Sequence, residues 1–147
     1  MTIVEANIEH LEDIAPLFNA YRIFYKQPSD LESAKQFLKD RILNKESIIY
    51  VAYKEKEAVG FTQLYPLFSS VSLKAMYLLN DLYVKANYRG NGIGEALINK
   101  AKALCETEQN KGLALQTATD NPAQKLYERL GFVKDHDLYY YWTRESK

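Results

Sequence analysis

The sequence has little cysteine and no excess of either charge, and each shortage excludes a class of protein. A single cysteine, Cys105, rules out a disulfide within the chain, and it falls on the apolar side of a predicted helix, as a buried thiol does. The 19 basic and 19 acidic side chains cancel, so nothing in the charge favours a nucleic acid or an anionic membrane as partner.

Long apolar runs and metal-binding patterns are also missing. No apolar run approaches the roughly 20 residues of a membrane-spanning helix, and the N-terminus has no apolar signal segment. The two histidines, His10 and His136, have no partners at metal-ligand spacing. We therefore expect a cytoplasmic protein that uses no metal.

What is present is one domain, residues 1–147, with strands and helices in a mixed order. The apolar pattern predicts an α/β (α+β) fold, with a mostly antiparallel sheet of six or seven strands flanked by about four helices. Gly60 indicates a bulge, and Pro66 a bend or departure from the ladder. Strands are expected at 3–6, 47–53, 58–68, 76–84, 113–117, 132–133 and 138–142, and helices at 8–25, 31–42, 93–109 and 123–130.

The most informative stretch joins the strand at 76–84 to the helix that follows it. Asn80 and Asp81 are the only strong polar interruption of that strand, and the junction reads Arg89-Gly90-Asn91-Gly92-Ile93-Gly94. Glycine lets the backbone approach a bulky anion, and the N–H groups of such a loop and of a helix N-terminus attract phosphate. A Walker A loop would end in Gly-Lys-Ser/Thr, and a dinucleotide fingerprint would read G-x-G-x-x-G. Neither fits.

Three segments resemble the GNAT superfamily of N-acetyltransferases. Arg89, Gly92 and Gly94 fill the pyrophosphate loop written Q/R-x-x-G-x-G/A. The run from Ala123 to Phe132 is similar to the A-x-x-L-Y-x-x-x-G-F signature, and the hairpin around Gly60 also fits. Within the superfamily, residues 77–84 and 88–90 are similar to the spermidine/spermine N-acetyltransferase branch. The resemblance implies a GNAT-like sheet that splays at the strand 76–84.

The resemblance also implies acetyl-CoA as cofactor. Backbone N–H groups of Leu82, Tyr83 and Val84 would bind the pantetheine and polarise the thioester carbonyl. The pyrophosphate would lie on the loop residues, which are Arg89, Gly90, Asn91, Gly92, Ile93, Gly94 and Glu95. Asn121, Ala123 and Tyr127 would complete the cofactor site; the asparagine of the family stands here at Asp120, so its role passes to Asn121.

Two residues with catalytic roles follow from the resemblance, with alternatives. Tyr127 matches the tyrosine that protonates the departing thiolate, although it also suits a packed position on a helix face. The polyamine branch has a glutamate base where this chain has Asn80, and an amide cannot take a proton. Asp81 is adjacent, but it faces the opposite side of a regular strand unless a bulge rotates it. A water chain is the other candidate base.

An acceptor pocket is expected beside the end of the first helix. Tyr21, Arg22 and Tyr25 lie there, with Gln63 and Tyr65 on the neighbouring strand. Aromatic faces suit a cationic amine, and an arginine suits a carboxylate. Ordinary core packing is the alternative for the helix residues, and it is the interpretation chosen for Phe24. The run 139–142 is expected to form a terminal strand or a subunit contact.

The sequence therefore predicts a homodimeric enzyme that acetylates a primary amine of a small molecule, polyamine-like or amino-acid-like. The alternative within the same fold is a CoA-binding sensor without turnover. A nucleoside-triphosphate hydrolase would require ATP to bind better than CoA.

Overall fold

The structure, a computed structural model, describes residues 1–144. Its contacts form two compact units: an N-terminal unit, Met1–Gln116, and a C-terminal unit that begins at Thr117. Each unit is described by itself. The expectation of a single domain remains a prediction.

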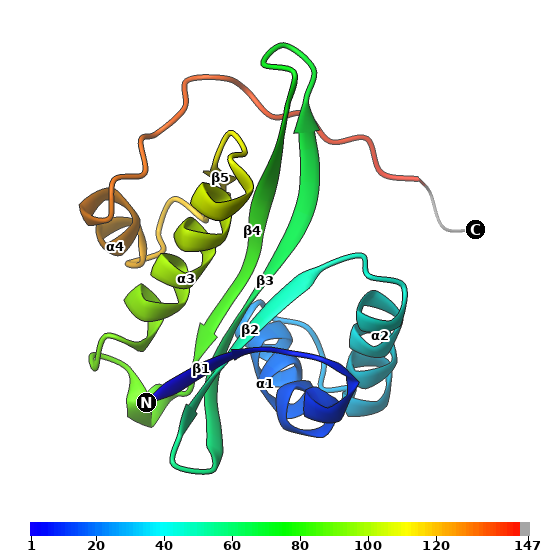
Figure 1. Ribbon diagram of the computed structural model, residues 1–147. Coiled ribbons are helices and arrows are strands. Elements are labelled where there is room, and N and C mark those ends of the chain that lie inside the picture. The colour runs from blue at the N-terminus through cyan, green and yellow to red at the C-terminus, as the bar shows by residue number, and fades with distance from the viewer. Residues whose placement is uncertain (145–147) are drawn as a thin grey trace. The chain divides into compact units, whose positions relative to one another are not determined.

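The N-terminal unit is built on a five-stranded sheet (Figure 1) in the order β1-β2-β3-β4-β5. The first four strands are antiparallel to their neighbours, and β5 runs parallel to β4. This confirms the predicted mixed, mostly antiparallel class. The strands are β1 (Thr2–Glu5), β2 (Ile48–Lys54), β3 (Glu57–Ser69), β4 (Lys74–Val84) and β5 (Leu113–Ala114).

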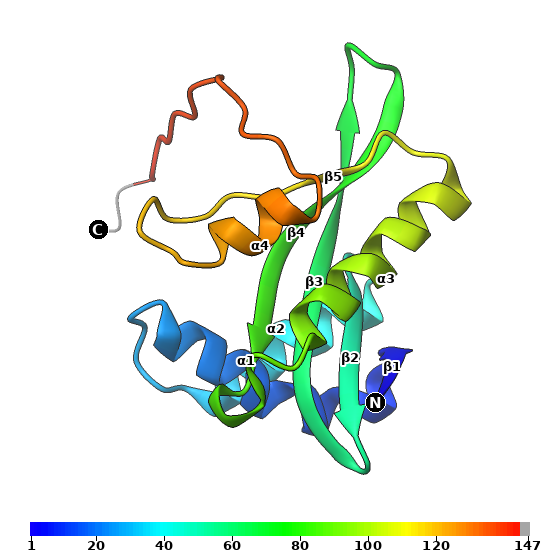
Figure 2. The ribbon, with the colours of Figure 1, turned by 90° about the vertical axis from the view of Figure 1, so that its left-hand side faces the viewer.

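Helices cover both faces of this sheet. The helical segments are η1 (Ile8–His10), α1 (Leu11–Phe24), α2 (Leu31–Leu43), η2 (Ala86–Tyr88) and α3 (Ile93–Glu108). The first two α-helices lie on one face and α3 on the other (Figure 2). Ile49, Val51 and Phe61 form the main apolar cluster with α1 and α2. Cys105 is buried on α3, as predicted.

Side-chain caps stand at the start of η1, which leads into α1, and at the start of α2. The Asn7 side chain accepts a hydrogen bond from the backbone N–H of Glu9 over 2.8 Å, which caps η1. The cap of α2 is the acidic residue directly before the helix. Asp30 is the cap, because its carboxylate accepts from the backbone N–H of Ser33 (3.1 Å).

Two predicted irregularities in the sheet have different outcomes. The register between β2 and β3 shifts beside Gly60, which confirms the bulge, and a Cβ on Gly60 would lie 3.0 Å from the Tyr83 carbonyl oxygen. Pro66 does not leave the ladder, because it pairs with Tyr77 of β4. The ladder tolerates a proline there because the pairing of β2 with β3 stops at Leu64, which leaves the edge of β3 beyond it without a partner.

The C-terminal unit contains the helix α4 (Gln124–Arg129), whose C-cap Leu130 is followed by Gly131 with a φ of 94°. The strands predicted at 132–133 and 138–142 are absent, and that prediction of six or seven strands is wrong. Their β-branched and aromatic composition favours a strand, but a strand also needs a ladder partner, and residues 132–144 have none. Across residues 1–144, the helices lack the length and apolar character that a membrane crossing requires.

Candidate functional site

A bulge in β4 rearranges the two polar residues of that strand. Gln63 of β3 pairs with Asp81, whereas the next residue, Leu64, pairs with Leu79, so Asn80 is the extra residue. In a regular strand Asn80 and Asp81 would point to opposite faces. Here the Asn80 amide donates to the Asp81 carboxylate over 2.7 Å. The bulge therefore brings both side chains together, which is the condition that the sequence left open.

Asp81 lies on the face of the sheet that α1 covers. It is 2% exposed, and its second oxygen accepts a hydrogen bond from the Gln63 amide over 2.5 Å. The Tyr21 hydroxyl reaches the same place from α1 and donates to the Asn80 carbonyl oxygen (3.1 Å). Burial raises the pKa of Asp81 above its ordinary value, and hydrogen bonds from Asn80, Gln63 and Tyr21 offset part of that rise.

Three of the predicted acceptor-pocket residues are tyrosines that lie within the electrostatic reach of Asp81. Burial raises the pKa of Tyr65 to about 12, and the charge of Asp81 adds to the effect. Burial also raises the pKa of Tyr21 and of Tyr25, and the charge of Asp81 is the second cause in both. The rings of Tyr21 and Tyr25 have centroids 4.9 Å apart. Asp81 is thus bordered by phenols that stay neutral at physiological pH.

The other two predicted pocket residues are placed differently. Gln63 has no exposed surface, because its amide bonds Asp81 at one end and the Ser47 hydroxyl, 2.8 Å away, at the other. In this conformation it touches Asp81 and cannot touch an acceptor. Arg22 has a buried Nη1 with no hydrogen-bond partner. Hydrogen bonds from Ser33 lower the pKa of the Asp30 carboxyl, and the positive charge of Arg22 lowers it further.

One edge of β4 is open next to Asp81. β5 pairs with β4 only at Tyr77 and Leu78, so no strand of the N-terminal unit pairs with the edge from residue 79 to 84. The Lys85 N–H donates to the Val59 carbonyl of β3 (2.9 Å), which sets the alternation along the strand. It follows that the N–H groups of Leu82 and Val84 point to the open edge, whereas that of Tyr83 points to β3.

The glycine loop has the backbone geometry of an anion cradle. Gly90 and Gly92 have φ of 80° and 78°, values that a residue with a Cβ rarely adopts. Gly92 caps α3, and its carbonyl accepts from Ala96. That bond is the first backbone hydrogen bond of the helix, and the N–H groups of residues 93–95, which include Gly94 and Glu95, come before it in the chain. Together with Asn91, they make up the loop that the sequence predicts to bind phosphate, and that role remains a prediction.

The Arg89 side chain is fixed against the end of β4. Its Nε donates to the Val84 carbonyl oxygen (2.8 Å), and its guanidinium carbon lies 5.4 Å from the Tyr83 ring centroid. The same carbon lies 5.7 Å from the Phe24 ring centroid. Phe24 is 54% exposed, so the interpretation of it as a core residue is wrong. The arginine therefore anchors the loop to the strand.

The remaining predicted residues belong to the C-terminal unit. The Asn121 side chain accepts from the Ala123 backbone N–H (2.9 Å), which shapes the turn before α4. Tyr127 lies on α4, with its ring edge-on to Phe132 at a centroid distance of 6.1 Å. Both facts concern packing within this unit, so the roles of these residues toward a cofactor remain predictions.

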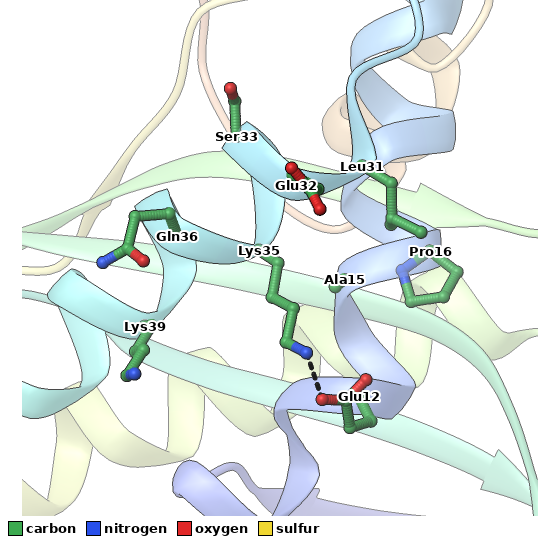
Figure 3. A pocket seen from close by; sticks show the side chains of 9 residues that line it. All are labelled: Glu12, Ala15, Pro16, Leu31, Glu32, Ser33, Lys35, Gln36 and Lys39. Atoms are coloured by element: carbon green, nitrogen blue, oxygen red, sulfur yellow. Dashed lines mark hydrogen bonds and ion pairs between the residues drawn. The ribbon is translucent and has the colours of Figure 1, made fainter.

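Two further observations define what the site is not. A groove of about 630 Å³ between α1 and α2 (Figure 3) contains an ion pair between Lys35 and Glu12, and none of the predicted site residues lines it. Across residues 1–144, no group of three or more His, Cys, Asp or Glu side chains is placed to hold a metal.

Sequence reasoning missed Ser47, because a lone serine at the start of a strand carries no functional signal.

Comparison with known proteins identifies the family. The model of the acetyltransferase (GNAT) domain matches residues 45–134. The uncharacterized N-acetyltransferase YhfO of Bacillus subtilis (strain 168) is 46% identical over 142 residues, which cover 96% of this chain and 95% of that protein. A probable acetyltransferase of Haemophilus influenzae is 32% identical, with coverage of 87% and 97%.

A solved structure agrees over the whole chain. The crystal structure of a probable acetyltransferase superposes with a TM-score of 0.91 at 41% identity, covering 100% of this chain and 99% of that one. The chain belongs to the GNAT family and is an acetyltransferase.

Proposed function

We propose that the protein transfers the acetyl group of acetyl-CoA to a primary amine of a small molecule, polyamine-like or amino-acid-like, and that Asp81 accepts the proton of that amine. One observation carries the proposal. The bulge at Asn80 turns Asp81 onto the face that carries Tyr21, while the N–H groups of Leu82 and Val84 follow at once on the same strand.

The residues present fit acetyl-CoA, the cofactor that GNAT acetyltransferases use. When bound, acetyl-CoA supplies a thioester whose carbonyl carbon the amine attacks. The cradle from Gly90 to Glu95 would hold the pyrophosphate with backbone N–H groups and the dipole of α3. The N–H groups of Leu82 and Val84 would hold the pantetheine and the thioester oxygen, a type of contact worth about 3–4 kcal/mol in the transition state.

The amine needs a proton acceptor because an alkylammonium with a pKa near 10.4 is neutral in only ~0.04% of molecules at pH 7. Asp81 meets this need, since burial raises the pKa of its carboxyl toward the working pH. The Asn80 amide holds one carboxylate oxygen in place. The faces of Tyr21, Tyr25 and Tyr65 suit a cation beside that carboxylate.

The second proton transfer concerns the thiolate of CoA that leaves. We assign it to Tyr127, since a phenol donates to a thiolate within hydrogen-bond reach. The match of residues 123–132 to the family signature supports this assignment. Arg22, whose buried Nη1 has no hydrogen-bond partner, supports an acceptor that carries a carboxylate, such as an amino acid. A homodimer in the cytoplasm, with no nucleic-acid or membrane partner, remains the prediction from sequence.

The test is release of free thiol from acetyl-CoA with a panel of polyamines, amino acids and simple alkylamines. We expect at least one primary amine to give release that depends on Asp81. If CoA binds in calorimetry and no amine of the panel gives release, the sensor replaces the enzyme of small amines. Stronger binding of ATP than of CoA would favour the hydrolase instead.

A further inference from the structure

The carboxylate of Asp81 is held by a chain of polar contacts that runs from β4 through β3 to the residue before β2. Gln63 of β3 is 0% exposed and donates through Nε2 to Asp81 over 2.5 Å. Its Oε1 accepts from the hydroxyl of Ser47, the residue before β2, over 2.8 Å. Both ends of a buried amide are thus satisfied, in a position where an apolar side chain would fill the same space.

The direction of this chain of contacts follows from the chemistry of its members. An ionised carboxylate can only accept hydrogen bonds, so the amide must turn its NH₂ end to Asp81. The Oε1 end then needs a donor, and within residues 1–144 the Ser47 hydroxyl is the donor bonded to it. Ser47 therefore stabilises the amide orientation that favours ionised Asp81.

We propose that Gln63, held in place by Ser47, is a positioning residue that keeps the Asp81 carboxylate ionised and aimed for proton transfer. The proposal rests on the proposed function, in which Asp81 is the proton acceptor. It removes Gln63 from contact with the acceptor and gives it a role through Asp81.

No cation is among the groups that act on Asp81 in the described part of the chain. The groups that face it are Tyr21 and Tyr25 from the end of α1, Gln63 and Tyr65 from β3, and Asn80 from β4. From α2, Arg41 acts on Tyr65. The ionised form of Asp81 thus depends on hydrogen bonds from neutral donors, and Gln63 supplies one of these hydrogen bonds.

The experiment follows the titration of the Asp81 carboxyl carbon by NMR in the full chain, beside the pH profile of kcat/KM. In Gln63→Met, which keeps the volume and removes the donor, we expect the pKa of Asp81 to rise by about 1 unit. The acidic limb of the rate profile should move by the same amount, and the rate should recover at higher pH. Ser47→Ala should give a smaller shift in the same direction.

Thr62→Val is the matched control. Thr62 is the neighbour of Gln63 on β3, is equally buried, and donates to the backbone carbonyl of Asp81 (2.8 Å), not to its carboxylate. This variant should lower the melting temperature without moving the titration of Asp81. If Gln63→Met and Ser47→Ala behave in the same way as Thr62→Val, the amide has only a structural role and the inference is overturned.

Failure of the proposed function gives a different result. If Asp81→Asn keeps the wild-type pH profile, Asp81 is not the proton acceptor, and the positioning role falls with it. If Asp81→Asn abolishes the acidic limb while Gln63→Met leaves it in place, the proposed function stands and only the inference fails. Should Gln63→Met fold poorly, Ser47→Ala carries the same comparison at a partly buried position.

Discussion

At the scale of single residues, Asp81 determines the expected pH dependence. Its carboxylate accepts a proton only when ionised, and burial raises its pKa. Activity should therefore be present above that raised pKa and fall as the pH is lowered through it. Asp81→Asn should remove this acidic limb and reduce kcat by about 10²-fold or more.

The control for Asp81 is its neighbour. Asn80→Asp keeps a carboxylate at 81 but replaces a donor by a second negative charge, so the acidic limb should move to higher pH with turnover retained there. Melting temperatures measured beside the profiles separate chemistry from folding. If Asp81→Asn unfolds the protein but leaves turnover per folded molecule normal, a water chain is the acceptor of the proton.

Tyr127 gives a second test at this scale. Tyr127→Phe removes one hydroxyl and keeps the ring against Phe132. We expect kcat to fall by about 10²-fold with the Kd for CoA unchanged, as for a group that acts only in the transition state. Unchanged activity at neutral pH would make Tyr127 a packing residue, and the thiolate would take its proton from water.

How far these residues could be predicted depends on what each prediction needed. Asn80 and Asp81 stood out because they are polar within an apolar strand. Their common orientation could not be predicted, because the bulge depends on the register with β3. Ser47 and the buried place of Gln63 were also out of reach, because both depend on contacts between strands.

At the scale of elements, the glycine loop joined to α3 is the part whose backbone matters most. Gly92 has φ of 78° and nothing within 4 Å of a Cβ built on it, so strain and not crowding is the obstacle to a side chain. Gly92→Ala should cost about 1 kcal/mol of stability and turn the N–H groups of the cradle away from their anion. We expect the Kd for acetyl-CoA to rise about tenfold, which is about 1.4 kcal/mol.

Gly112→Ala is the comparison for this loop, since Gly112 also has a positive φ, of 140°, and lies outside the cradle. It should lower stability and leave the affinity for acetyl-CoA unchanged. Equal losses of affinity in the two variants, measured by calorimetry, would show that the effect comes from general destabilisation and not from the cradle.

Elements with a local signal were predicted well. Helices α1, α2 and α3 follow from apolar periodicity and caps, and the hairpin of β2 and β3 follows from two apolar runs around a charged turn. The strand expected at 138–142 had an equally good local pattern, yet Tyr139, Tyr140, Tyr141 and Trp142 are 68–85% exposed. A strand is completed by its neighbour, and the sequence of one strand does not name that neighbour.

At the scale of the whole molecule, binding of acetyl-CoA should stabilise the folded chain. A ligand at 100 times its Kd adds about 2.7 kcal/mol, which for a chain of this size is a rise of roughly 5–10 °C in melting temperature. ATP at the same concentration should give a smaller rise. A larger rise in melting temperature with ATP in the same thermal-shift assay would contradict the proposed acetyl-CoA site.

The fold class could be predicted at this scale because the order of strands and helices leaves few arrangements of a mixed sheet. The identity of the acceptor could not be predicted. Tyrosines beside a carboxylate suit many amines, and in the proposed function Arg22 is the residue that favours acceptors with a carboxylate over those without one.

The bulge in β4 also breaks the usual link between a residue's number and the side of the strand on which its side chain lies. A strand has only two sides, so the parity of a residue number normally decides which side its side chain takes. One inserted residue resets that parity, and an acidic group can then move one place along the chain without leaving its place in space. A comparison by alignment column would find an amide at position 80 and would miss the carboxylate that, in the proposed function, stands at position 81 instead.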